Sequence, residues 1–174
     1  MKKKSTQIEI LINELHLYIV NSPLFRKNTT NKSETEIQTE IRPIILNFLE
    51  KYFASKSYKD AKAKANKSFY WEGQEGKYGR SKSRFFGGRN YPDFIITDPY
   101  LIAIEYKKSE TPSLVKQGFG QAIMHTMSEE FDFVYYLFQD ESKDKYVVDS
   151  IKNDSERMII RKMWDDFNVY FKII

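Results

Sequence analysis

Two short apolar runs joined by a proline-containing turn constrain the fold more strongly than any other part of the sequence. The run YPDFIIT covers residues 91–97, the turn is DPY, and the run LIAIEYKK covers residues 101–108. Isoleucine-rich runs of this length, bounded by proline and aspartate, are typical of β-strands. The stretch therefore predicts two paired strands.

Charged residues interrupt these two strands at defined positions. Because side chains alternate between the faces of a strand, Glu105 and Lys107 share one face and lie about 6–7 Å apart. Asp93, on the preceding strand, reaches the same end of the sheet. Two carboxylates suit a hard cation such as Mg²⁺, and a lysine beside them can orient an attacking water and stabilise developing charge. The pattern indicates phosphodiester hydrolysis.

Amphipathic helices are expected before the strand pair. Apolar side chains recur at helical spacing over residues 8–19, and residues 21–33 form a polar linker. Ser33 has the character of an N-cap for a second helix that reaches about Phe53. Pro43 lies inside this second helix and is a candidate kink.

The order of the remaining elements predicts the fold class. Residues 131–140 are apolar on both faces, which is typical of an interior strand. Residues 67–73 are a candidate strand, and the glycine-rich residues 73–90 a long loop or hairpin. A helix over 109–130, a charged turn, a helix over 155–167 and a strand over 168–174 complete the chain. The result is an α/β fold, a mixed sheet flanked by helices.

Length and composition narrow the class of protein. The 174 residues suit a single domain, for which we expect an N-terminal helix and linker at 1–32, a motif-bearing core at 33–138 and a C-terminal helix and strand at 139–174. The chain has no cysteine, which excludes disulfides, thiolate zinc sites and cysteine nucleophiles. This fits the reducing cytoplasm, the location we expect. No apolar run approaches membrane-spanning length, so no membrane association is predicted.

Positive charge is concentrated in one segment. Between Lys62 and Arg89 there are eight basic and two acidic residues, a net charge of +6, whereas the whole chain carries +4. Aromatic residues are interleaved with these charges, as in surfaces that contact phosphates and bases. The segment predicts a nucleic-acid footprint, and its candidate binding residues are Lys77, Arg80, Lys82, Arg84 and Arg89.

The motif residues resemble those of a known family. Pro92-Asp93, eleven intervening residues and Glu105-Tyr106-Lys107 are similar to the PD-(D/E)XK nuclease motif. The stretch SETEIQTEIRPIILNFLEKYF resembles the first helix of the nuclease domain in type I restriction enzyme motor subunits. EYKKSETPSLVKQGFGQAI resembles their motif strand and following helix. The resemblance covers roughly residues 33–138.

This resemblance implies a restriction endonuclease-like α/β/α fold and a Mg²⁺- or Mn²⁺-dependent deoxyribonuclease. Asp93 and Glu105 would bind metal, and Lys107 would position the water. The helix after the motif would supply a glutamine, for which Gln121 is the first choice and Gln117 the second. Some relatives carry a tyrosine four residues after that glutamine, where this chain has His125, so the role of His125 stays open.

The family also places an acidic residue from the preceding helix in the site, as a further metal ligand. At ~100° per residue, Glu34 lies in the middle of the apolar face of residues 34–53. Glu40 lies to one side of that face and Glu36 nearly opposite. We therefore expect Glu34, with Glu40 as the second choice.

Structural roles are the alternative for each candidate. Asp93 could belong to a turn, Glu105 and Lys107 to a solvated ion pair, and Glu34 to a first-turn charge that complements the helix dipole. The same fold could also serve as a catalytically silent nucleic-acid-binding or complex-forming module. Two carboxylates facing a phosphate backbone would repel it in the absence of metal, which favours the nuclease.

The expected partners follow from the nuclease hypothesis. The substrate implied by the resemblance is DNA, although the residues themselves do not distinguish DNA from RNA. Double-strand cleavage would suggest a homodimer, and a subunit of a larger defence complex is a further option. No small-molecule cofactor is expected.

Overall fold

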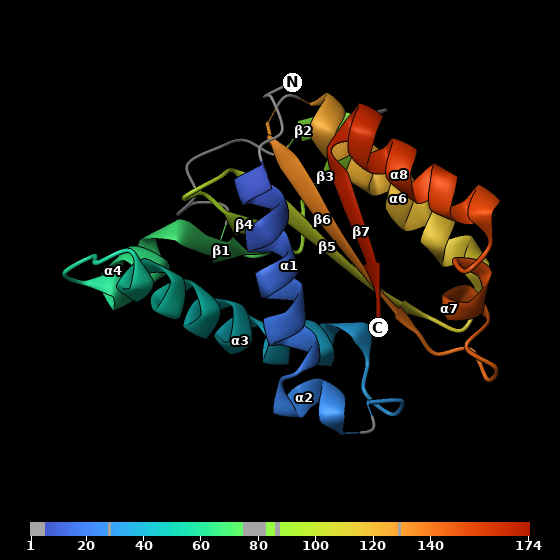
Figure 1. Ribbon diagram of the computed structural model, residues 1–174, viewed down its shortest axis with the longest axis horizontal. Helices are drawn as coiled ribbons and strands as arrows, with labels where there is room; N and C mark the ends of the chain where they lie inside the picture. The colour runs from blue at the N-terminus through green and yellow to red at the C-terminus, as the bar shows by residue number, and fades with distance from the viewer. Residues whose placement is uncertain (1–5, 28, 75–82, 86–87, 129) are drawn as a thin grey trace.

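A five-stranded mixed sheet with helices on both faces forms the body of the protein (Figure 1). The computed structural model describes residues 6–27, 29–74, 83–85, 88–128 and 130–174, with 83–85 and 88–90 described by their backbone. The strand order is β1-β4-β5-β6-β7. The predicted α/β class with a mixed, helix-flanked sheet is therefore confirmed.

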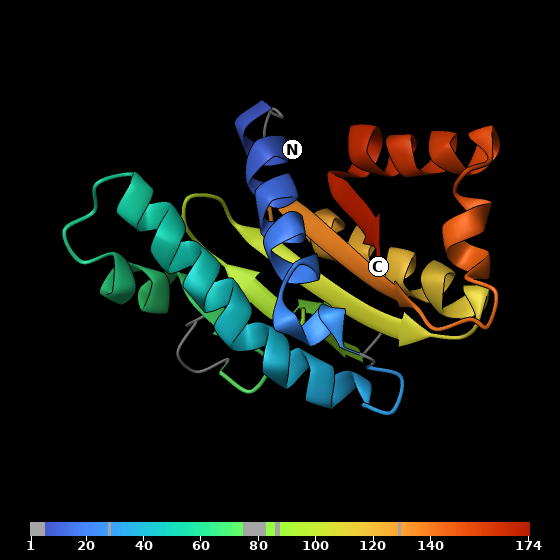
Figure 2. The ribbon, with the colours of Figure 1, turned by 60° about the horizontal axis from the view of Figure 1, so that its bottom comes forward.

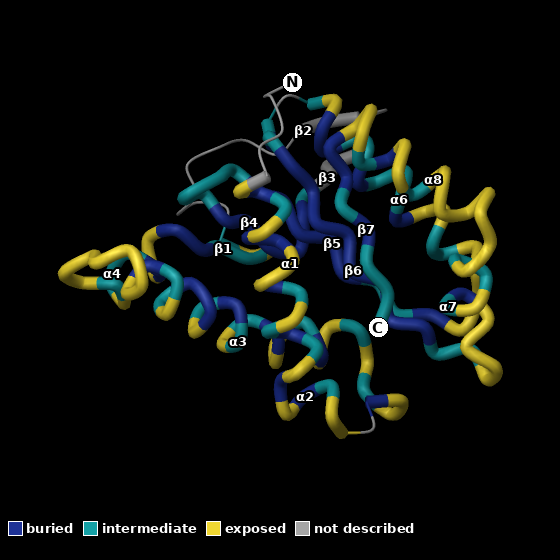
Figure 3. The backbone as a smooth tube through the Cα atoms, in the orientation of Figure 1, coloured by how far each residue is buried: buried dark blue, intermediate teal, exposed yellow. Residues whose placement is uncertain are grey.

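The first half of the sheet is antiparallel and the second half parallel. Strands β1 (Phe69–Trp71), β4 (Phe94–Ile96) and β5 (Ile102–Ser109) pair antiparallel. Strands β6 (Phe133–Asp140) and β7 (Val169–Ile173) follow parallel to β5. All eight residues of β6 are buried, which confirms the predicted interior strand (Figure 3).

One face of the sheet is covered by the N-terminal helices. These are α1 (Thr6–Val20), α2 (Pro23–Arg26), α3 (Glu34–Ser55) and α4 (Ala61–Ser68), with α3 lying across the sheet (Figure 2). Their apolar side chains pack with Ile102, Ile104 and Tyr106 of β5. Helix α3 starts with a capping box, because Ser33 and Glu36 exchange hydrogen bonds.

The opposite face is covered by α6 (Pro112–Met127), α7 (Tyr146–Ser150) and α8 (Asp154–Phe167). Their buried residues Ala122, Val147 and Met163 pack against Ala103 of β5 and against β6. From Ile102 to Tyr106 the alternation along β5 therefore sends even-numbered side chains towards α3 and odd-numbered ones towards α6, whereas Lys107, near the end of the strand, reaches Glu34 at the start of α3.

Several details differ from the sequence prediction. Helix α4 was not predicted; its alanine-rich residues have high helix propensity, and the Asp60 side chain caps it by accepting from Ala63 N. Helix α2 lies within the predicted linker 21–33, and α7 lies between the charged turn and the last predicted helix, where no element was predicted. Helix α3 continues through Pro43 to Ser55.

The glycine-rich segment forms the predicted hairpin in its described part. Strands β2 (Ser83–Phe85) and β3 (Gly88–Asn90) make a separate two-stranded antiparallel sheet. Among the described helices, none is long and apolar enough to span a membrane.

Candidate active site

The β-ladder register brings the two predicted metal ligands side by side. Phe94 pairs with Ile104 across β4 and β5, so Asp93, immediately before β4, lies opposite Glu105. On its other side, the carbonyl of Asp93 accepts a hydrogen bond from Glu72 N at 3.1 Å. Residues directly opposite in an antiparallel pair have Cβ atoms only about 4.5–5.5 Å apart. Asp93 and Glu105 are therefore neighbours on the α6 face of the sheet.

Asp93 is held in a position that disfavours its charged form. Its side chain is buried, and Oδ2 accepts a hydrogen bond from Tyr106 N at 2.7 Å. Burial, followed by the negative charge of Glu105, raises the pKa of Asp93 well above its usual value. Lys107 and the Tyr106 N–H act in the opposite direction without cancelling that rise. A cation beside Asp93 would relieve the unfavourable charge.

Glu105 is buried beneath α6. Only 2% of the residue is exposed, and its Oε1 lies 2.6 Å from Nε2 of His125. His125 is fully buried and comes from the last turn of α6. The sequence left the role of His125 open; the structure makes it the hydrogen-bond partner of a motif carboxylate. A sequence signal exists, because Gly118, Ala122 and His125 recur at helical spacing on the face that α6 buries.

Lys107 links the strand motif to helix α3. Its Nζ lies 3.2 Å from Oε1 of Glu34, and the backbone N of Lys108 donates to Oε2 of Glu34 at 3.2 Å. Burial alone would lower the pKa of Lys107, but Asp93, Glu105 and Glu34 together raise it above its usual value. Lys107 therefore serves here as a positive charge among three carboxylates.

Among the three candidate helix carboxylates, only Glu34 contacts the motif. Glu36 is engaged with Ser33 in the capping box, and Glu40 forms an ion pair with Lys32 on the exposed side of the helix. Ser33 determines where α3 begins, so the cap also places Glu34 in the first turn.

A polar network fixes the segment that leads into α3. Lys108 Nζ donates to the carbonyl oxygens of Thr29, Thr30 and Lys32 at 2.8, 2.9 and 2.7 Å. The same ammonium lies 3.4 Å from Glu141 Oε2, and only 12% of the Lys108 side chain is exposed. Lys108 therefore ties this segment to the end of β5, next to Glu34.

The predicted glutamine lies one turn before His125 without contacting the carboxylates. Gln121 Oε1 is buried and has no hydrogen-bond partner among the described residues. Gln117 is exposed. The structure therefore brings together Asp93, Glu105, Lys107 and Glu34, and it adds His125, whose role the sequence left open, as the α6 residue that contacts Glu105.

The basic segment is described only in part. Arg84 and Arg89 are direct partners in the β2–β3 register, so both belong to the same short ribbon. Lys77, Arg80 and Lys82 lie outside the described residues.

The donor set fits a hard divalent cation through two carboxylates. No group of three or more Asp, Glu or His side chains in the described ranges is gathered as a ready metal cage. Asp93 and Glu105 are nevertheless adjacent oxygen donors, and burial together with the charge of Glu105 raises the pKa of Asp93. Mg²⁺ commonly binds through one or two carboxylates and keeps several waters, which matches this arrangement.

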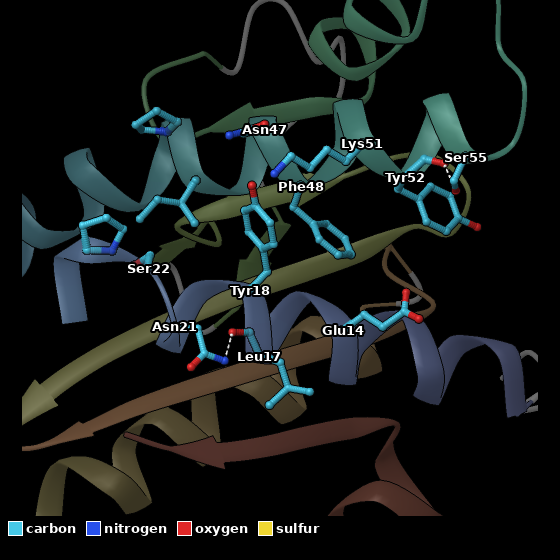
Figure 4. Close-up of a pocket in the computed structure, with 13 residues that line it drawn as sticks. Glu14, Leu17, Tyr18, Asn21, Ser22, Asn47, Phe48, Lys51, Tyr52 and Ser55 are labelled. Atoms are coloured by element: carbon cyan, nitrogen blue, oxygen red, sulfur yellow. Dashed lines mark hydrogen bonds between the residues drawn. The ribbon is translucent and has the colours of Figure 1, made fainter. Parts of the chain in front are cut away.

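A separate groove of about 860 Å³ lies between α1 and α3 (Figure 4). Tyr18 and Phe48 point into it, and it includes none of the candidate site residues.

Comparison of the chain with protein-family models, curated proteins and solved structures finds no match. The assignment of function therefore rests on the geometry of the site.

Proposed function

We propose that this protein is a metal-dependent endonuclease of the PD-(D/E)XK class that hydrolyses DNA phosphodiester bonds. The observation that carries the proposal is the juxtaposition of Asp93, immediately before β4, and Glu105 of β5. Two residues further along β5, Lys107 donates a hydrogen bond to Glu34 of α3. The five-stranded mixed sheet with helices on both faces is compatible with a restriction endonuclease-like fold.

Each residue has a distinct chemical role in this proposal. Asp93 and Glu105 hold a Mg²⁺ or Mn²⁺ ion, which supplies Lewis-acid activation of water and of the scissile phosphate when bound. Lys107 donates hydrogen bonds that orient the attacking water and stabilise charge on the phosphate oxygens. Glu34 accepts from Lys107 and so fixes the direction of its ammonium.

The burial of the carboxylates favours catalysis over simple nucleic-acid binding. A surface that only binds DNA gains nothing from buried carboxylates, because they repel phosphate. Burial beside Glu105 raises the pKa of Asp93, so keeping Asp93 charged in the fold costs folding free energy. Such a cost is expected where a site is arranged for function rather than stability. The basic segment ending at Arg89 supplies the positive charge that would track the DNA backbone.

The test is a cleavage assay on supercoiled plasmid and on labelled single-stranded, duplex and branched DNA with Mg²⁺ or Mn²⁺. We expect cutting that EDTA abolishes and that Asp93→Asn and Lys107→Ala reduce by at least about 100-fold, the scale of losing one electrostatic catalytic group. Lys152→Ala is the control, because Lys152 is an exposed lysine paired with Asp149 on another part of the surface.

Two results would count against the proposal. Cleavage that survives Asp93→Asn would point to a contaminating nuclease. An inactive wild type that still binds DNA in a salt-dependent manner would instead indicate the catalytically silent binding module.

A further inference from the structure

A hydrogen bond between His125 and Glu105 links α6 to the proposed metal site. His125 Nε2 lies 2.6 Å from Glu105 Oε1, with both side chains at most 3% exposed. Among the described residues no other hydrogen bond to the Glu105 side chain is present. The position of this carboxylate therefore depends on the imidazole above it.

The surroundings of the imidazole define which nitrogen carries hydrogen. Nδ1 is buried and has no hydrogen-bond partner among the described residues, and the ring meets Phe131 edge-on at 5.7 Å between centroids. A hydrogen on Nδ1 would be a buried donor without an acceptor, which is unfavourable. A hydrogen on Nε2 is instead donated to the Glu105 carboxylate, where it forms a charge-assisted hydrogen bond.

Helix α6 packs closely against the sheet, and this close packing allows His125 to contact Glu105. Gly118 lies against the ring of Tyr136, closer than any side chain would permit, and Ala122 is fully buried one turn later. These small residues bring the helix axis near the sheet, so that His125 reaches Glu105 with a short hydrogen bond.

We propose that His125 is a positioning residue for the proposed nuclease: its Nε2–H holds Oε1 of Glu105 and leaves Oε2 free to bind the divalent cation. This inference rests on the proposed function. It assigns a role to His125, which stands four residues after Gln121, where some relatives carry a tyrosine. Partners that orient metal-ligating side chains typically contribute 10–100-fold to metal affinity.

Two substitutions separate the hydrogen bond from the mere presence of a polar residue. Glutamine at position 125 carries its amide nitrogen at the place of Nε2, whereas asparagine ends near Nδ1. His125→Gln should therefore retain Mn²⁺ affinity within about 3-fold of wild type, and His125→Asn should weaken it by about 10–100-fold. Mn²⁺ binding is measured by titration calorimetry without DNA, alongside Asp93→Asn.

The matched control is the second histidine of the chain. His16 Nδ1 contacts Tyr135 OH at 2.9 Å on the other face of the sheet, so His16→Asn should leave Mn²⁺ affinity unchanged. Thermal unfolding of each metal-free variant checks the fold.

A measurement on the metal-free wild type is independent of any variant. Nitrogen-15 NMR of the imidazole should show hydrogen on Nε2 and a bare Nδ1; the opposite tautomer would overturn the proposal. Mn²⁺ affinity that falls in Asp93→Asn but not in His125→Asn would overturn the positioning role while leaving the nuclease intact. Absence of Mn²⁺ binding by wild type would overturn both.

Discussion

Gly118→Ala tests the closest helix–sheet approach in the protein. A Cβ at Gly118 would lie 2.2 Å from Tyr136 Oη and 2.3 Å from its Cζ, more than 1 Å short of an ordinary contact. The ring of Tyr136 cannot easily retreat, because it is fully buried and packed against Phe119 and Phe171 at centroid distances of 5.3 and 5.0 Å. Helix α6 must therefore move away from the sheet.

The expected cost follows from two opposing terms. Overpacking of a filled core costs about 3 kcal/mol at the upper end of its usual range, while replacing glycine by alanine inside a helix contributes about 1 kcal/mol. The net loss is about 2 kcal/mol, or a fall in Tm of about 4–8 °C for a chain of this size.

Gly120→Ala is the matched control in the same helix. A Cβ there meets nothing within 4 Å, so only the propensity gain remains, about 1 kcal/mol and a Tm rise of about 2–4 °C. Urea and thermal unfolding followed by circular dichroism measure both variants. The reasoning fails if Gly118→Ala is as stable as wild type, or if adding Tyr136→Phe restores its stability, because the ring carbon remains in the way.

Three further predictions concern the site and the start of α3. The pKa of Asp93 is raised in the fold, so in the metal-free protein the contribution of Asp93 to stability should rise as pH falls through that folded pKa and be fully present below the unfolded value near ~4. Asp93→Asn should remove this gain and be more stable than wild type at pH 8; urea unfolding showing the reverse would refute the burial argument. Lys108→Met removes the ammonium from three carbonyls and from Glu141 and should cost about 3 kcal/mol, whereas a loss below about 1 kcal/mol would show the network to be dispensable. Ser33→Ala deletes the cap of α3 and should cost about 1 kcal/mol by the same assay; no change would mean that packing alone places the helix start.

Sequence patterning predicted the features that depend on neighbours in the chain. The alternation along β5 places Glu105 and Lys107 on one face, and the Ser33 cap starts α3 one residue before Glu34. Short-range geometry decides such features, since strand periodicity and helix capping involve residues within four positions of each other. Helix α4 was missed because its residues AKAKANKS carry no apolar periodicity that would predict a helix.

Contacts between distant residues could not be read in this way. Glu34 reaches Lys107 across 73 positions, and His125 reaches Glu105 across 20. Which of several carboxylates or polar helix residues enters the site depends on how deeply α3 and α6 pack and in which rotation. The close fit of Gly118 to Tyr136 and the hydrogen bonds of Lys108 are two of the contacts that contribute to this packing.

The sequence by itself determined the paired strands, the motif residues on them and the helices that flank them, because each follows from local periodicity and turn chemistry. Only the tertiary structure decided that β6 and β7 run parallel to β5, that Glu34 is the helix carboxylate beside Lys107, and that His125 holds Glu105. These depend on the packing of whole elements, whose depth and orientation emerge from many side chains acting together rather than from any single stretch.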